Sequence, residues 1–172
     1  TLRMQHCCLT DGHSAELSDF LVHLPHLHSL SLADNYLTDV GIKAISPSIK
    51  TLAGLQHLDL SGNAMGDEGC AALTDALGAC EGLAYLDISR NNVTSLSIRH
   101  LTLRLARHSN RFTHLSLAHN PIGDGAAALG SLLMYNKPAS LQVCDLSHCG
   151  VTDLGVKELS AAIPQCGSLI SL

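Results

Sequence analysis

Two aspartates stand at equivalent positions of neighbouring segments, where paired carboxylates could do acid–base chemistry. Asp59 and Asp87 lie 28 residues apart, each between two apolar residues of a short alternating segment. Two carboxylates held close together can raise the pKa of one of them and so divide the roles of acid and base. Because no nucleophile, oxyanion donor or phosphate-binding loop accompanies them, we predict no catalytic residue. We interpret the pair as a solvated acidic surface that attracts a basic partner.

Two histidines and an aspartate have the ligand types that zinc uses. His119, His148 and Asp145 would have to converge on one ion from separate segments. The chain has 11 histidines among 172 residues, so neighbouring histidines arise readily by chance. We therefore predict no metal site and no cofactor. Histidines on a binding surface predict instead that partner affinity varies with pH between about 5.5 and 7.

A repeated motif must position these side chains. An asparagine follows an apolar alternating segment four times, as in Leu55-x-x-Leu58-x-Leu60-x-x-Asn63, and cysteine takes its place at both ends. The marked positions are Cys7, Asn35, Asn63, Asn91, Asn120 and Cys149, spaced by 28 or 29 residues. Alternation with a period of two predicts a short strand with one buried face. An inward asparagine can satisfy the backbone groups of the turn that follows.

A helical pattern follows each strand. Its first residue is expected to be the N-cap, because aspartate and serine accept hydrogen bonds from the first free N–H groups of a helix. These expected caps are Asp11, Asp39, Asp67, Ser95, Asp124 and Asp153. The pattern after Ser95 partly alternates, so strand is the competing interpretation there, but the flanking repeats favour helix. Stacked strand–turn–helix units predict a parallel sheet on one side and helices on the other.

The motif resembles the leucine-rich repeat, and its length resembles the ribonuclease-inhibitor-like subfamily. The resemblance covers essentially the whole chain. It implies an α/β fold, a right-handed solenoid shaped as a horseshoe arc, with a parallel β-sheet on the concave face and helices on the convex face. Residues 1–172 are expected to form a single domain of about six repeats. A seventh motif begins at Ser168 and neither end carries a polar capping repeat, so we expect a piece of a longer array or larger protein.

Exposed strand positions define the predicted protein-binding surface on the concave face. Tyr85 is the predicted anchor, flanked by His57 and His114 in adjacent repeats, because tyrosine offers a large, rigid contact area. The alternative is an ordinary strand tyrosine lying on the sheet. The full predicted set on this face is Tyr36, His57, Asp59, Tyr85, Asp87, Arg90, His114 and Asp145.

Charge is distributed unevenly along the chain. The net charge is −5, yet no acidic residue lies between Asp87 and Asp124. Four arginines of this segment form an alternative protein-binding patch, expected on the convex side or the edge: Arg99, Arg104, Arg107 and Arg111. Such a patch could dock an acidic protein, although a solvated helix face explains it equally simply. The net negative charge and the 3% of aromatic residues argue against nucleic acid as a partner.

The seven cysteines match no paired C-x-x-C pattern, and their odd number argues against a disulfide framework. We expect reduced thiols in a cytoplasmic protein. No signal peptide is visible, and no apolar run is long enough for a membrane span.

Together these features predict a non-catalytic scaffold that binds a protein partner through the concave sheet and its edge loops. We expect neither enzymatic activity nor a small-molecule substrate. The resemblance makes a cytoskeletal or axonemal component one candidate and an adaptor another. The alternative is a GTPase-activating protein resembling the Ran type, which belongs to the same subfamily and would act on a nucleotide bound to another protein.

Overall fold

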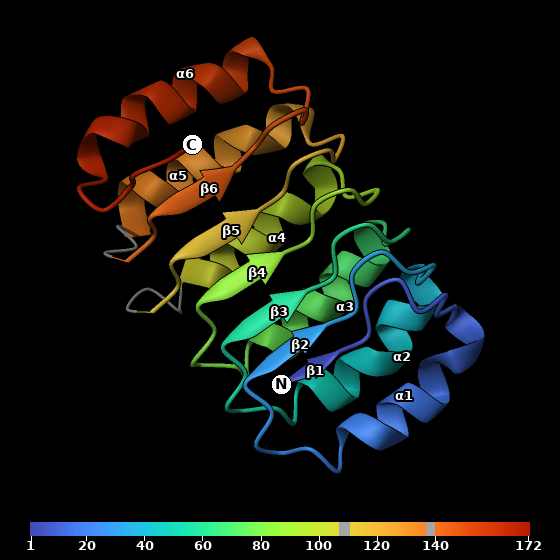
Figure 1. Ribbon diagram of the computed structural model, residues 1–172. Helices are drawn as coiled ribbons and strands as arrows, with labels where there is room; N and C mark the ends of the chain where they lie inside the picture. Colours follow the sequence, from blue (N-terminus) through green and yellow to red (C-terminus); the bar gives the residue numbers. More distant parts are fainter. Residues whose placement is uncertain (107–110, 137–139) are drawn as a thin grey trace.

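The computed structural model describes residues 1–106, 111–136 and 140–172, in which short strands alternate with helices (Figure 1). The strands are β1 (Leu2–Arg3), β2 (Ser29–Ser31), β3 (His57–Asp59), β4 (Tyr85–Asp87), β5 (His114–Ser116) and β6 (Val143–Asp145). The helices are α1 (Ser14–Leu21), α2 (Asp39–Ile49), α3 (Asp67–Leu77), α4 (Ser95–Leu105), α5 (Ala126–Asn136) and α6 (Asp153–Ala162). Short 3-10 turns are η1 (Asp11–His13), η3 (Gly123–Gly125) and η4 (Ile163–Gln165).

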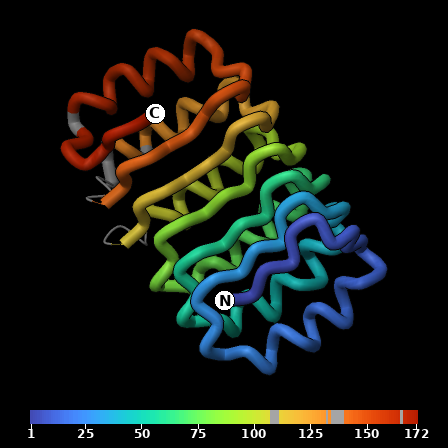
Figure 2. Tube along the Cα trace, viewed as in Figure 1, coloured from blue at the N-terminus to red at the C-terminus, as the bar shows by residue number. Residues whose placement is uncertain are grey.

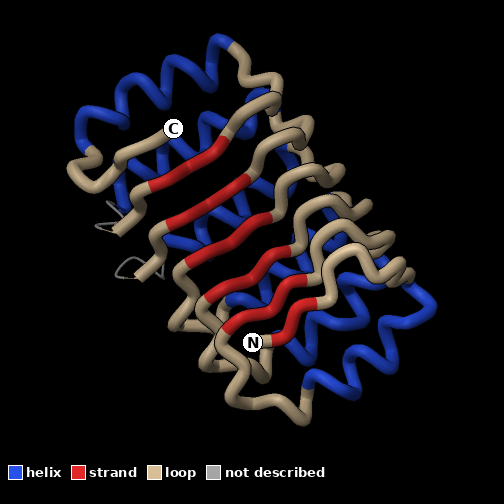
Figure 3. Tube along the Cα trace, viewed as in Figure 1, coloured by secondary structure: helices blue, strands red, loops and turns tan. Residues whose placement is uncertain are grey.

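The strands form one parallel sheet in the order in which they occur in the chain, β1 to β6. The tube view shows the chain advancing repeat by repeat from one end of the stack to the other (Figure 2). All strands lie in one layer and the helices lie behind them in a second layer (Figure 3). The sheet therefore keeps one open face, as the predicted leucine-rich-repeat solenoid requires.

The core lies between these two layers. The central residue of each strand from β2 to β6 points into it: Leu30, Leu58, Leu86, Leu115 and Cys144 are paired in register and buried. In α4, Ile98, Leu101 and Leu105 are buried, whereas Leu96 and Leu103 are exposed. This spacing of three and four residues is helical, so the structure decides the strand-or-helix alternative in favour of the helix.

The asparagine positions join neighbouring turns, as the sequence predicts. The side-chain oxygen of Asn91 accepts a hydrogen bond from the backbone N–H of Met65 at 3.0 Å. Its amide nitrogen donates to the carbonyl oxygens of Leu60, Ile88 and Ser89 at 3.0–3.1 Å. At the equivalent position Cys149 donates from Sγ to the carbonyl of Leu117 at 3.2 Å. The ladder thus satisfies backbone groups that would otherwise be buried without partners.

The N-caps of α2, α3, α4 and α6 lie one residue earlier than we predict, whereas Asp11 and Asp124 lie within the 3-10 turns η1 and η3. Thr38 and Thr94, not the aspartate and serine that follow them, adopt the extended N-cap conformation and accept hydrogen bonds from the helix. The aspartate bridges to the next repeat instead. Asp67 accepts bonds from the backbone N–H of Thr94 at 2.9 Å, from its hydroxyl at 2.6 Å and from the Ser97 hydroxyl at 2.6 Å. Asp11 makes the matching bridge to Thr38.

Candidate protein-binding surface

The open face of the sheet presents two rows of side chains. Because successive strand residues point to opposite faces, the buried Leu58 places His57 and Asp59 on the open side of β3. The same holds in β4 for Tyr85 and Asp87, which pair in register with His57 and Asp59. One row is aromatic and the other acidic, and each runs across the strands.

The aromatic row contains His57, Tyr85 and His114. The ring centroids of His57 and Tyr85 are 4.0 Å apart with the planes inclined by 12°, so these two rings stack. His114 lies on the other side of Tyr85, with a centroid distance of 5.7 Å. Burial, together with the negative charges of Asp87 and Asp59, raises the pKa of Tyr85 to about 12. The phenol is therefore neutral at physiological pH, and the row is a half-buried aromatic ridge. The structure brings these three residues together as the sequence predicts.

The acidic row contains Asp59, Asp87 and Asp145. In each, Oδ1 accepts a hydrogen bond from the backbone N–H two residues further on, at 3.1, 2.9 and 2.9 Å respectively. These short-range bonds fix the carboxylates in one orientation. In Asp145 the bonds to Ser147 come first among the causes that lower the pKa of the carboxyl group. Asp59 and Asp87 are register neighbours, and Ser116 separates Asp87 from Asp145 along the row.

A third row, formed by the residues just before the asparagine positions, has left-handed backbone. The φ angles are +53° at Asp34, +64° at Gly62 and +51° at Arg90. The guanidinium of Arg90 reaches across Gly62 to Asp34, with 2.7 Å between Nη2 and Oδ1. A Cβ at Gly62 would lie 2.2 Å from that same oxygen. His6 also approaches Asp34, with Nε2 3.3 Å from Oδ2.

This ion pair gives Arg90, predicted as a contact residue, a partner two repeats away. Sequence reasoning missed Asp34 and His6 as members of the network. The one available signal was Gly62, a residue type that tolerates positive φ, at the same motif position as Asp34 and Arg90. This glycine could have revealed the left-handed row from the sequence, but nothing in the sequence indicates that Arg90 pairs with Asp34.

His119 and His148, which lie in the turns after β5 and β6, are neighbours in the structure. The rings of His119 and His148 stack, with centroids 4.3 Å apart and planes inclined by 14°. Both side chains are exposed, and their charges contribute to the lowered pKa of Asp145. Within residues 1–106, 111–136 and 140–172 no group of three or more potential metal ligands converges on one point.

Tyr36 lies apart from the two rows. It is 64% exposed and sits in the loop after β2, where its backbone pairs with the loop of the first repeat. It therefore belongs to the edge of the sheet face rather than to the aromatic ridge.

The predicted basic patch is partly paired. Arg104 on α4 lies 3.1 Å from Asp75 on α3, and His100 approaches the same carboxylate at 3.5 Å. Arg99 is exposed on α4. Arg111 lines a hollow of about 360 Å³ at the edge of the sheet together with Glu81. Arg107 lies outside the described residues. The helix side is therefore a mixed surface of both charges.

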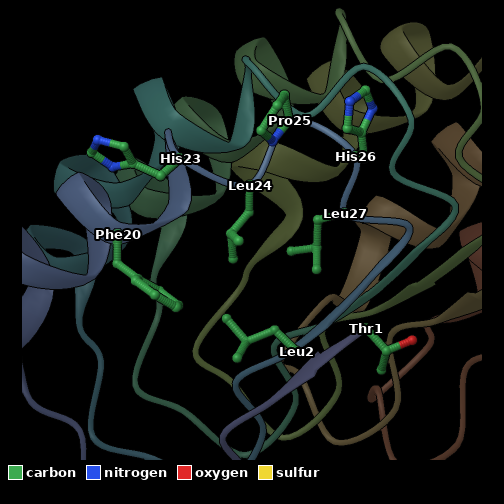
Figure 4. A pocket seen from close by; sticks show the side chains of 8 residues that line it. All are labelled: Thr1, Leu2, Phe20, His23, Leu24, Pro25, His26 and Leu27. Atoms are coloured by element: carbon green, nitrogen blue, oxygen red, sulfur yellow. The ribbon is translucent and has the colours of Figure 1, made fainter.

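An apolar hollow of about 460 Å³ lies beside β1 and the end of α1. Leu2, Phe20, Leu24 and Leu27 point into it (Figure 4). It faces the end of the stack and not the open sheet, so it is separate from the aromatic and acidic rows. In the part of the chain that the structure describes, no helix combines the length and hydrophobicity needed to cross a bilayer.

The repeat pattern, the ladder and the parallel sheet define a protein class that comparison with known families confirms. The model of the family described as Leucine Rich repeat matches residues 23–46, 55–73, 108–129 and 137–160, together more than half of the chain. The chain belongs to the leucine-rich repeat family.

One curated relative is NACHT, LRR and PYD domains-containing protein 7 from Homo sapiens, which is 43% identical over 65 residues. The match covers 37% of this chain and 6% of that protein, so the chain corresponds to only a small part of it.

Two solved structures share the fold over most of their length. The leiomodin-1 structure titled Actin-Binding Site 2 aligns with a TM-score of 0.66 and 15% identity, covering 87% of this chain and 89% of its own. The tropomodulin C-terminal domain from Caenorhabditis elegans aligns with a TM-score of 0.68 and 11% identity, covering 86% and 92%.

Proposed function

We propose that this chain is a non-catalytic protein-binding domain whose binding surface is the open face of the sheet. The row of His57, Tyr85 and His114, in which His57 stacks on Tyr85, is the observation that carries the proposal. A half-exposed tyrosine that its neighbours hold rigid loses little conformational freedom on binding, and tyrosine is enriched among residues that dominate interface energies. The edge residues Tyr36 and Arg90 extend the same surface.

The kind of partner is part of the proposal. The similar leiomodin-1 structure is named for an actin-binding site, and its alignment covers most of this chain. We therefore propose a cytoskeletal role and take actin as the first partner to test. Membership of the ribonuclease-inhibitor-like subfamily, a cytoplasmic location and a place within a larger protein belong to the same proposal.

The GTPase-activating alternative has weaker support. An activator of that kind needs an arginine or a polar side chain free to reach a nucleotide held by its partner. The guanidinium of Arg90 is instead engaged by Asp34 at 2.7 Å. Stimulated GTP hydrolysis by a Ran-like GTPase in the presence of this chain would reverse this ranking.

The test is a comparison of Tyr85→Ala with Leu103→Ala in binding to monomeric and filamentous actin. Leu103 is 59% exposed on α4, on the helix side, so its truncation is the matched control. If Tyr85 is an interface anchor, its truncation weakens binding by about 2 kcal/mol, or roughly 30-fold, and the control leaves it unchanged. Hydrogen exchange in the complex must then show protection of β3 to β5. Protection confined to the helices would contradict the proposal.

A further inference from the structure

The two rows of the open face together specify the chemistry of the partner. We propose that they bind a segment of a protein partner that carries two basic side chains, one seated between Asp59 and Asp87 and the other at Asp145. This inference rests on the proposed function, because it concerns the same surface and adds what that surface selects.

The first support is that, in the part of the chain that the structure describes, these carboxylates have no arginine or lysine partner, whereas other acids do. No arginine or lysine of the described residues forms an ion pair with Asp59, Asp87 or Asp145. The acids that do pair with arginine or lysine are Asp34 with Arg90, Glu68 with Lys43 and Asp75 with Arg104. The acidic row is therefore negative charge that remains available to a partner.

The second support is that the donors already bound to Asp59 and Asp87 are neutral and leave the charge in place. On Asp59, Oδ2 accepts from the Ser31 hydroxyl at 2.9 Å. On Asp87, Oδ2 accepts a long bond from the Tyr85 hydroxyl, at 3.4 Å. Adjacent parallel strands are about 4.8 Å apart, so two like charges face each other across β3 and β4. Such opposed charges are unfavourable until a cation lies between them.

The aromatic ridge beside this row fits the remainder of a basic side chain. Lysine and arginine carry long apolar stems that pack on hydrophobic surface while the charged head stays with its partner. The stacked rings of His57 and Tyr85 flank Asp59 and Asp87 on the same strands. Burial lowers the pKa of His57, even though Asp59 and Asp87 act in the opposite direction. Its ring is therefore neutral at pH 7 and does not oppose an incoming cation.

Apart from Arg90, whose guanidinium is paired with Asp34, the cationic groups on this face lie toward its ends. Arg3 occupies the acidic-row position of β1, two strands from Asp59, with Ser31 between them. His119 and His148 lie in the turns after β5 and β6, and both approach Asp145 closely enough to lower its pKa. The strongest negative potential at neutral pH thus lies over β3 and β4.

The geometry also sets the spacing of the two basic residues. From the midpoint of β3 and β4 to β6 the distance is two and a half strand spacings, or about 12 Å. An extended segment advances about 3.3 Å per residue. Because alternate residues of an extended segment point to the same side, the two basic residues are expected to be four positions apart, a span of about 13 Å. A nucleic acid would be repelled by the same carboxylates.

The test is a selection of random dodecapeptides displayed on phage against the wild-type chain, followed by titration of the selected peptides with purified variants. The key variant is Asp59→Asn combined with Asp87→Asn, since the amide oxygen can still accept the backbone N–H bond that orients each side chain. The matched control is Glu16→Gln with Asp19→Asn, which removes the same charge from exposed positions of α1. Circular dichroism establishes that each variant is folded.

We expect selected peptides to contain two lysines or arginines four residues apart. The Asp59→Asn, Asp87→Asn variant should bind them at least tenfold more weakly, and the α1 control within twofold. Peptides without basic enrichment, binding unchanged in the aspartate variant, an equal loss in the α1 control, or no selected peptide would each overturn the inference. If Tyr85→Ala alone abolishes binding, the proposed function stands while this inference fails. If neither face variant weakens binding, both fail.

Discussion

Replacing Asn91 by alanine tests how far the asparagine ladder holds the repeats together. The side chain makes four buried hydrogen bonds, one as acceptor and three as donor. Alanine removes the only side-chain acceptor of the Met65 N–H, and an orphaned buried donor costs about 1–3 kcal/mol. The three carbonyls that lose the amide keep a second donor from neighbouring repeats. Each of these losses is therefore smaller, about 0.5 kcal/mol.

The summed effect is a loss of about 3 kcal/mol in the free energy of unfolding. For a chain of this size that corresponds to a fall in Tm of about 6–12 °C. Asn91→Cys should lose less, because a thiol can donate to two of the carbonyls, as Cys149 does. Asn92→Ala is the control, since its side chain is exposed and the change should stay within about 0.5 kcal/mol.

The assay is urea unfolding followed by circular dichroism at 222 nm, because the chain has no Trp. The expected order of stability is wild type and Asn92→Ala, then Asn91→Cys, then Asn91→Ala. A loss below 1 kcal/mol in Asn91→Ala, or an equal loss in Asn92→Ala, would show that the ladder bonds do not carry the stability assigned to them.

Two further changes test single features of the fold. Gly62→Ala should lower the free energy of unfolding by at least 1 kcal/mol more than Gly150→Ala. Both glycines have positive φ, but a new Cβ would meet Asp34 at Gly62 and no atom within 4 Å at Gly150. The difference between the urea midpoints of the two variants therefore measures the clash. Burial raises the pKa of Asp67, but hydrogen bonds, the largest from Ser97, outweigh it and leave the pKa below its ordinary value. The carboxylate therefore stabilises the fold above that value and this stability is lost as pH falls from about 5 to 2; Asp67→Asn should flatten that acid loss in pH-dependent unfolding, and an unchanged acid profile would contradict the assignment.

The repeat pattern predicts the strands, their parallel order and the buried leucines, because each rests on local periodicity. The row of His57, Tyr85 and His114 was also predictable, since one motif position recurs in adjacent strands. The helix caps were misplaced because threonine and aspartate are adjacent and both are good caps. Only the structure shows that the aspartate is drawn to the following repeat. The pairing of Arg90 with Asp34 depends on a side-chain conformation that no periodicity encodes.

The bridge from Asp67 to Thr94 and Ser97 bears on how such an array could be lengthened or shortened. The acceptor carboxylate belongs to one repeat, and the donor N–H and hydroxyl groups belong to the next. The hydrogen bonds therefore form only when the two repeats carry matching residues. A recombined array would keep these hydrogen bonds wherever an aspartate precedes a repeat whose helix is capped by threonine. At the N-terminus of α3, where Gly66 is the N-cap, the backbone N–H groups of Gly66 and Gly69 bind Asp39 instead. An incoming repeat at that boundary therefore needs no threonine, but it needs glycine at position 69, where a Cβ would lie 2.7 Å from Oδ1 of Asp39.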